Sequence, residues 1–345
     1  MNDARYYSLN TYLRQTFGEK VYRLSLNGGM TCPNRDGSIG TGGCIFCSAG
    51  GSGDFAASPQ QSVTGQIAQA KLLLREKTNC RKYIAYFQAY TNTYAPVGVL
   101  RALYTEALAQ PDIVALSIAT RCDCLPPDVL DLLAELNTIK PVWVELGLQT
   151  IHEHTLRFIR SGFSLAQYEQ AVSALHARGI KVITHLILGL PGETKEDVEE
   201  TIRRVQELGP DSLTVHSLAI KRASRLSQWI LEHGISTLHN TDETMAIAAQ
   251  GAKQMGMEPY YLYRQKNMSG NFENVGYAKP GKAGIYNILI MEEVQTIMAL
   301  GAGTISKRVY GDGRIERCDN VKDVGQYIER IDEMIQRKQQ LFSEE

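Results

Sequence analysis

Residues 181–218 read KVITHLILGLPGETKEDVEETIRRVQELGPDSLTVHSL. The first eight residues form an apolar run rich in branched side chains, which is typical of a strand covered on both faces. A stretch of helical periodicity begins after Thr194 and breaks at Gly209, and its apolar stripe consists of Val198, Ile202, Val205 and Leu208. A second apolar run follows at Ser212. A strand, a helix and a strand in this order predict a βαβ unit with parallel strands and a right-handed crossover.

The same alternation extends over most of the chain. The candidate strands are Val21–Leu26, Tyr83–Gln88, Ile113–Ala119, Val142–Leu148, Lys181–Leu188 and Ser212–Leu218. One of the intervening helices has clear ends, since Ser164 begins a Ser-x-x-Gln capping box with Gln167 and Gly179 ends the periodic stretch. Six such repeats favour an α/β fold, a partial (β/α)6 TIM-like barrel rather than the closed eightfold one.

The pattern changes after about residue 235. Thr241–Met255 predicts one more helix, whereas Tyr260–Gly284 is crowded with Tyr, Asn, Gly and Lys and is expected to be a surface segment, too polar for a buried strand. Asp323–Lys338 is expected to be a single amphipathic helix, whose apolar face holds Val324, Ile328, Ile331 and Ile335. We therefore expect a core barrel over residues 1–235 and a small C-terminal α+β extension over 236–345 that caps or flanks it.

Composition limits the possible functions. The 345 residues are 43% hydrophobic and 21% charged, which is ordinary for a soluble globular protein and unlike a disordered or fibrous chain. There are 36 Lys and Arg against 37 Asp and Glu, so a nucleic-acid partner would need a local basic patch. Met1–Asn10 lacks a secretory signal, and no window approaches the ~18 apolar residues of a membrane span. We expect a cytoplasmic protein without membrane association, whose seven cysteines are free thiols or metal ligands.

Three of these cysteines lie in a glycine-rich loop, residues 28–53, directly after the first predicted strand. Cys32, Cys44 and Cys47 have the spacing C-x11-C-x2-C. A redox pair would leave the third cysteine unexplained. Structural zinc normally has four protein ligands, whereas the next cysteine is Cys80 and the nearest histidine is His152. Three thiolates with one vacancy suit an iron–sulfur cluster that has an open iron, and zinc and unligated thiols stay open as alternatives.

A three-cysteine loop after the first strand of a six-unit β/α barrel, ending Cys-x-Phe-Cys, resembles the radical S-adenosylmethionine (SAM) superfamily. The resemblance implies a [4Fe–4S] cluster on Cys32, Cys44 and Cys47, with SAM bound at the open iron. One electron, from an external donor of the flavodoxin or ferredoxin type, would then cleave SAM to a 5′-deoxyadenosyl radical that removes a substrate hydrogen. The residues it assigns to SAM binding are Phe46, Gln88, Thr120, Arg121, Glu145, Gln149, Ile187 and Gly189. Core packing is the alternative for Phe46, and Glu145, in an apolar run, is expected to have a polar partner.

Two halves of the chain resemble different members of this superfamily. Residues from about 12 to 190 resemble a bacterial group related to the catalytic subunit of Elongator, and the similarity lies in the stretches 24–37, 86–94 and 143–149. This resemblance implies remodelling of a modified tRNA wobble uridine. Residues from about 211 to 340, through 213–225 and 260–277, resemble the oxygen-independent coproporphyrinogen III dehydrogenases, which decarboxylate propionates in heme biosynthesis. Cys122 departs from the first group, where proline is expected. Natural recombination, an artificial chimera and an intermediate lineage all remain open.

Three functions follow from these motifs and resemblances. The chain modifies tRNA, or it oxidises coproporphyrinogen III, or it is a zinc-stabilised binding module without activity. The expected substrate contacts, to phosphates or propionates, are Lys221, Arg222, Arg264, Gln265 and Asn267. Arg157, Arg160 and Arg225 are further basic residues that could contact phosphates or belong to a solvated charged face. Cys124 is a candidate hydrogen donor; the alternative is that Cys122 and Cys124 are two small buried residues. The directions of His185 and His216, and the oligomeric state, stay open.

Overall fold

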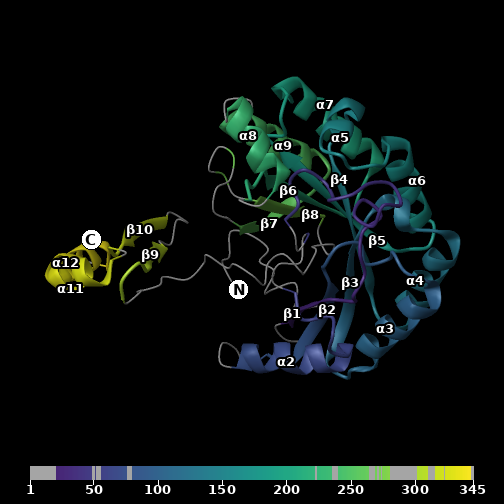
Figure 1. Cartoon of the computed structure of the whole chain (residues 1–345), viewed down its shortest axis with the longest axis horizontal. Coiled ribbons are helices and arrows are strands. Elements are labelled where there is room, and N and C mark those ends of the chain that lie inside the picture. Colours follow the sequence, from purple (N-terminus) through teal and green to yellow (C-terminus); the bar gives the residue numbers. More distant parts are fainter. Residues whose placement is uncertain are drawn as a thin grey trace. The chain divides into compact units, whose positions relative to one another are not determined.

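Six parallel strands pair in the order in which they occur along the chain (Figure 1). Their bounds are β1 Val21–Leu26, β2 Lys82–Phe87, β3 Ile113–Thr120, β4 Val142–Gln149, β5 Lys181–Leu188 and β6 Ser212–Ser217. The protein is represented by a computed structural model, which describes residues 21–48, 51, 56–75, 80–221, 224–234, 240–263, 269, 272, 274–279, 301–309, 315–321 and 323–342. The sheet curls into an open half-barrel, which confirms the predicted partial TIM-like fold.

Helices alternate with these strands and cover the convex side of the sheet (Figure 1). They are α2 Val63–Arg75, α3 Val97–Ala109, α4 Pro127–Ile139, α5 Glu153–Phe158, α6 Leu165–His176, α7 Lys195–Leu208, α8 Arg225–His233 and α9 Asp242–Gln254, with a short 3-10 helix, η1 Cys122–Cys124. The predicted capping box of Ser164 and Gln167 starts α6. Gly209, with a φ of 63°, ends α7 in the left-handed region that suits glycine. No helix in the described residues is long and apolar enough to cross a membrane.

The two faces of the sheet differ in polarity. On β4, Val142, Val144, Leu146 and Leu148 are buried in the hydrophobic core that the helices share with the convex face. Successive side chains of a strand point to opposite faces, so Glu145 points to the concave, inner face. Four other polar residues also stand next to a core residue in their strand and therefore point to the inner face: Tyr86, Ser117, His185 and His216. The inner face of the half-barrel therefore carries a set of polar side chains.

Two antiparallel strands extend the sheet beyond β6, which the sequence did not predict. They are β7 Glu258–Tyr263 and β8 Asn274–Ala278, and the order continues β6-β8-β7. Every residue of β8 is buried, so the expectation of a surface segment was wrong here. Pairing with β6 satisfies the polar groups: Ser217 N donates to the Asn274 side chain (2.9 Å), and Ser212 Oγ donates to Tyr277 O (2.8 Å). The compact unit that holds the sheet accordingly ends at Ile290, beyond the boundary expected at residue 235.

The second compact unit, Met291–Glu345, holds an antiparallel hairpin and two helices. The hairpin consists of β9 Ile305–Val309 and β10 Ile315–Asp319, and the helices are α11 Val324–Glu329 and α12 Ile331–Phe342. The expected single helix is therefore interrupted, and Arg330, with a φ of −108°, lies between the two parts. The four residues assigned to its apolar face, Val324, Ile328, Ile331 and Ile335, are exposed. The buried side chains of α12 are Met334, Lys338 and Leu341.

Candidate active site

The three cysteines lie on a loop that folds back on itself after β1. Arg35 N donates to Cys32 O (2.8 Å), and Cys47 N donates to Cys44 O (3.1 Å), so each end of the loop makes a tight turn. Gly43 N donates to Asn34 O (2.8 Å) and joins the two turns. All three thiols are half-buried, and none forms a disulfide. Glycine-rich backbone thus brings together cysteines that lie well apart in the sequence.

The surroundings of the loop favour a thiolate. A hydrogen bond from the Cys44 thiol, with the nearby charges of Arg35 and Lys221, lowers the pKa of Cys47 to about 6. The same hydrogen bond, together with burial and the charge of Cys32, raises the pKa of Cys44 well above its usual range. The thiolate is the form of cysteine that binds metal, and soft sulfur ligands suit an iron–sulfur cluster. No three His, Cys, Asp or Glu side chains in the described part of the chain converge as the ligands of one ion do. A cluster does not require this, since its cysteines bind separate irons.

Two basic residues from the β6–α8 region lie against the cysteine loop. Lys221 Nζ donates to Gly51 O (3.2 Å). The guanidinium of Arg225 packs on Gly42, whose φ of +79° lies in the left-handed region that favours glycine. A substrate contact of Lys221 stays a prediction. The other predicted substrate contacts lie outside the described residues; they are Arg222, Arg264, Gln265 and Asn267.

Thr120 and Arg121 stand at the end of β3, where the sequence placed SAM contacts. The Arg121 guanidinium donates to both carboxylate oxygens of Asp123, at 2.9 and 2.7 Å. Its positive charge also acts on Cys44, which places it beside the cysteine loop. The Thr120 hydroxyl lies 2.5 Å from the Thr93 hydroxyl. The structure therefore brings this strand end and the cysteines together.

The remaining residues assigned to SAM also lie in the loop or at strand ends. Phe46 is half-buried and packs against the core, as the alternative interpretation expected, and Gln88 directly follows β2. Gln149 ends β4 with a φ of 71°, in the left-handed region that non-glycine residues rarely adopt. Ile187 lies near the end of β5, and Gly189 follows with a φ of 83°. The carboxyl ends of parallel strands meet at one edge of a barrel, so these residues share that edge. Their contact with SAM stays a prediction.

A chain of polar contacts crosses the inner face of the sheet from β2 to β6, with one residue from each strand. Glu145 accepts hydrogen bonds from Ser117 Oγ (2.7 Å) and Tyr86 OH (3.3 Å), and its Oε2 lies 3.2 Å from His185 Nε2. His185 Nδ1 lies 2.9 Å from His216 Nε2, with the two rings stacked at 5.2 Å. Burial lowers the pKa of His216 to about 3, so this ring is neutral near pH 7. The expected polar partner of Glu145 is confirmed, and both histidines point inward.

Sequence reasoning missed Tyr86 and Ser117 as members of this set. The alternation of both residues with apolar core neighbours, which Glu145 shares, indicates that they point to the inner face, but not that they belong to a site. Nothing local distinguished them from ordinary strand residues.

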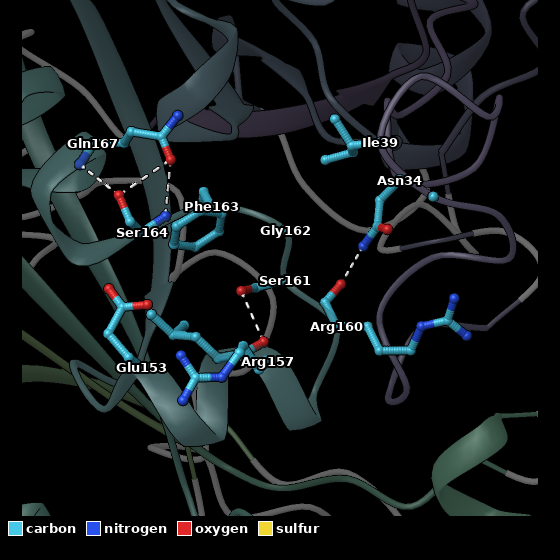
Figure 2. A pocket seen from close by; sticks show the side chains of 12 residues that line it. Asn34, Ile39, Glu153, Arg157, Arg160, Ser161, Gly162, Phe163, Ser164 and Gln167 are labelled. Atoms are coloured by element: carbon cyan, nitrogen blue, oxygen red, sulfur yellow. Dashed lines mark hydrogen bonds between the residues drawn. The ribbon is translucent and has the colours of Figure 1, made fainter.

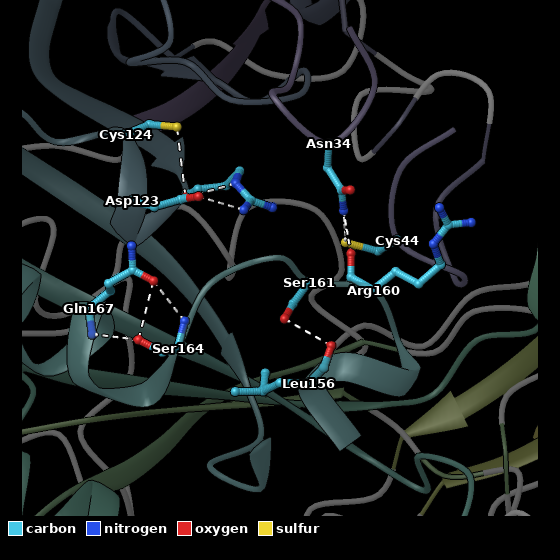
Figure 3. A network of polar contacts seen from close by, with 10 residues as sticks. Asn34, Cys44, Asp123, Cys124, Leu156, Arg160, Ser161, Ser164 and Gln167 are labelled. Atoms are coloured by element: carbon cyan, nitrogen blue, oxygen red, sulfur yellow. Dashed lines mark hydrogen bonds and ion pairs between the residues drawn. The ribbon is translucent and has the colours of Figure 1, made fainter. Parts of the chain in front are cut away.

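The two cysteines of η1 have different surroundings. Cys122 belongs to the hydrophobic core. Cys124 is also buried, but its Sγ lies 3.8 Å from Asp123 Oδ1, beside the Arg121–Asp123 pair (Figure 3). Burial raises the pKa of each thiol to about 12, so both are protonated near pH 7. Cys122 thus matches the alternative of a small buried residue, and a role of Cys124 as hydrogen donor stays a prediction.

Comparison with known proteins identifies the family. The model of the Radical SAM superfamily matches residues 34–205, and an overlapping match to Peptidase family U32 covers residues 144–269. The chain is 43% identical over 248 residues to "Uncharacterized protein YtqA" of Bacillus subtilis, which is 72% of this chain and 77% of that protein. The chain belongs to the radical SAM superfamily, whose enzymes use a [4Fe–4S] cluster and SAM.

Other relatives divide between the two resemblances. The chain is 35% identical over 266 residues to "Oxygen-independent coproporphyrinogen-III oxidase-like protein HemZ" of Bacillus subtilis, which is 74% of this chain and 53% of that protein. It is 28% identical over 121 residues to "tRNA uridine(34) acetyltransferase" of Methanocaldococcus jannaschii, which is 34% of this chain and 22% of that protein. Coproporphyrinogen III oxidase (HemN) from Escherichia coli superposes with a TM-score of 0.50 at 16% identity, covering 91% of this chain and 69% of that one. This last likeness shows a shared fold.

Proposed function

We propose that this radical SAM enzyme modifies the wobble uridine of tRNA in the cytoplasm, with its cluster held by Cys32, Cys44 and Cys47 and its electron supplied by an external protein. When bound, the cluster and SAM supply a carbon radical that removes a hydrogen atom from the substrate. The chain's own residues hold the cofactors, orient the substrate base and exclude water from the inner face of the half-barrel.

The polar inner face is the observation that carries this proposal. Buried hydroxyl, carboxylate and imidazole groups are costly unless they form hydrogen bonds, and a substrate that matches them is favoured. A uridine presents one N–H and two C=O groups on one edge of its ring. His185, which is half-buried and backed by the buried Glu145, is the member of this set that such an edge can reach. A porphyrinogen carries several propionate carboxylates, which the carboxylate of Glu145 in the same wall would repel. The chemistry of the wall therefore favours a nucleobase.

One relative supports the same class of substrate. One relative is named as a tRNA uridine(34) acetyltransferase, and the sequence stretches 24–37, 86–94 and 143–149 resemble the Elongator-related group. The stretch 24–37 includes Cys32 and the start of the cysteine loop, and the stretch 143–149 includes the inner-face residue Glu145.

Oxidation of coproporphyrinogen III is the second candidate. The observation that favours it is the similarity to the HemZ protein, which extends over 74% of this chain. Propionates would need basic partners, and the basic residues predicted for this role are Lys221, Arg222 and Arg264. Lys221 donates to the cysteine loop, which supports its role there at least as well as a role in substrate binding.

The decisive experiment is anaerobic reconstitution followed by incubation with SAM, dithionite and either total tRNA or coproporphyrinogen III. We expect iron and sulfide at about four per chain, and formation of 5′-deoxyadenosine that tRNA stimulates. Stimulation by coproporphyrinogen III alone would replace the first proposal with the second. Stoichiometric zinc without iron would refute both. Cys44→Ala should lose the cluster, whereas the matched control Cys80→Ala, whose thiol donates to Lys82 O (3.0 Å), should keep it.

A further inference from the structure

A cavity of about 500 Å³ lies between the cysteine loop and the segment that follows β4. Asn34, Ile39 and Gly40 of the loop form one wall. The other wall consists of residues between α5 and the start of α6, namely Glu153, Leu156, Arg157, Arg160, Ser161, Gly162, Phe163, Ser164 and Gln167. Figure 2 shows Asn34 and Ile39 facing Gly162 and Arg160 across the cavity, with Arg157 and Glu153 on the far rim. This cavity is not used by the mechanism above.

The wall of the cavity is in direct contact with a cluster ligand. Asn34 Nδ2 lies 3.5 Å from Cys44 Sγ and also donates to the carbonyl oxygen of Arg160 (Figure 3). Ile45 N donates to Ile159 O (3.1 Å), which fixes the same two segments to each other. Arg160 has a φ of 57°, an unfavourable conformation that the contact with Asn34 helps to hold. One side chain therefore separates the cavity from the sulfur of Cys44.

The rim combines positive charge with exposed apolar surface. Arg157 and Arg160 are exposed, and within the described residues neither guanidinium has an ion-pair partner. The Glu153 carboxylate accepts a hydrogen bond from Leu165 N (2.9 Å), which partly satisfies its charge. Ile39, which lines the cavity, is 50% exposed. Arginine side chains beside an exposed apolar side chain are typical of protein–protein interfaces, and an acidic partner would complement the two arginines.

We propose that this rim is the docking surface for an acidic one-electron carrier protein, which delivers its electron to the cluster through the Asn34–Cys44 contact. The proposal rests on the proposed function, since it needs the cluster on Cys32, Cys44 and Cys47. In this step the carrier is oxidised by one electron and the cluster is reduced by one, with no bond or proton transferred.

An RNA partner is less well matched to the same surface. RNA binding depends on several phosphate contacts, whereas this rim offers two arginines and carries the carboxylate of Glu153, which repels phosphate. The exposed Ile39 side chain suits the apolar part of a protein interface. The polar inner face, where the nucleobase is proposed to bind, is formed by other residues.

The test uses the reconstituted full-length protein and a recombinant acidic flavodoxin as probe. The variant is Arg157→Glu/Arg160→Glu. The control, Arg81→Glu/Lys253→Glu, makes the same charge change at two other exposed positions, before β2 and in α9. We measure the Kd for flavodoxin at low and high salt, and the rate of 5′-deoxyadenosine formation driven by flavodoxin or by dithionite. Iron content and far-ultraviolet circular dichroism check that the variants are loaded and folded.

The double variant should bind flavodoxin about tenfold or more weakly at low salt, and the difference should shrink at high salt. Its flavodoxin-driven rate should fall in parallel, with an unchanged dithionite-driven rate, and the control should behave as the unaltered protein does. An unchanged Kd for flavodoxin would overturn the proposal. So would a loss of dithionite-driven tRNA turnover with flavodoxin binding intact, because the arginines would then bind RNA. If the unaltered protein makes no 5′-deoxyadenosine with dithionite, the proposed function fails, and the Kd values still decide whether the carrier docks here.

Discussion

Replacement of His216 should remove a specific part of the acid sensitivity of the fold. Burial lowers the pKa of His216 from 6.5 to about 3, with a further contribution from the neighbouring His185. In the unfolded chain this histidine binds a proton as the pH falls below 6.5, whereas in the folded protein it stays neutral until about pH 3. Stability from the neutral ring is therefore complete above pH 6.5 and is lost progressively as the pH falls toward 3.

The magnitude follows from the two pKa values. Each pH unit between them costs ~1.4 kcal/mol, so the free energy of unfolding should fall by about 2 kcal/mol between pH 7 and pH 5 because of this one residue. His216→Gln removes the titrating group and can still form hydrogen bonds. The groups that face His216 stay in place in this variant: His185, the adjoining Glu145, and Asn274.

The assay is anaerobic urea unfolding at pH 7, 6 and 5, followed by the fluorescence of Trp143 and Trp229, the two tryptophans. The unaltered protein should lose about 2 kcal/mol more over this range than His216→Gln does. His154→Gln, at an exposed histidine on α5, is the control and should keep the full pH dependence. Equal pH dependence in the unaltered protein and His216→Gln would refute the idea that burial holds this ring neutral.

Three other substitutions test the packing around the site. In Gly251→Ala on α9, the added methyl group would overlap the side chain of Ile202 on α7 and should destabilise the protein by about 1–3 kcal/mol. Adding Ile202→Ala to the same chain should recover part of that loss. A double-mutant cycle of urea midpoints measures the recovery. Asp123→Asn should lower the free energy of unfolding by about 3–5 kcal/mol, because it leaves the largely buried Arg121 guanidinium without its carboxylate partner. An unchanged urea midpoint would contradict this expectation. Gly189→Ala should lower the free energy of unfolding by about 1–3 kcal/mol. The φ of 83° at this position disfavours other residues, and the added Cβ would lie 2.9 Å from Asn240 and Ser269. A Tm equal to that of the unaltered protein would show that this turn relaxes.

Local sequence determined the repeating part of the fold. The strand at Lys181–Leu188 has the predicted bounds, and α6 starts at the predicted capping box of Ser164 and Gln167. Such features depend on residues three or four positions apart, whose side chains act on their own backbone. The spacing of Cys32, Cys44 and Cys47 is equally local, and for that reason it pointed to the cofactor directly.

Only the tertiary structure decided which distant groups meet. Glu145 takes its partners from residues 59, 28 and 40 positions away, namely Tyr86, Ser117 and His185, and no local pattern links them. Lys221 reaches a carbonyl 170 residues earlier in the chain, at Gly51. The composition of Tyr260–Gly284 predicted a surface segment, yet β8 within it is buried, and its pairing with β6 supplies the hydrogen bonds. Burial of a polar group is favourable only when its partner is present, and the fold of the whole sheet determines where that partner lies.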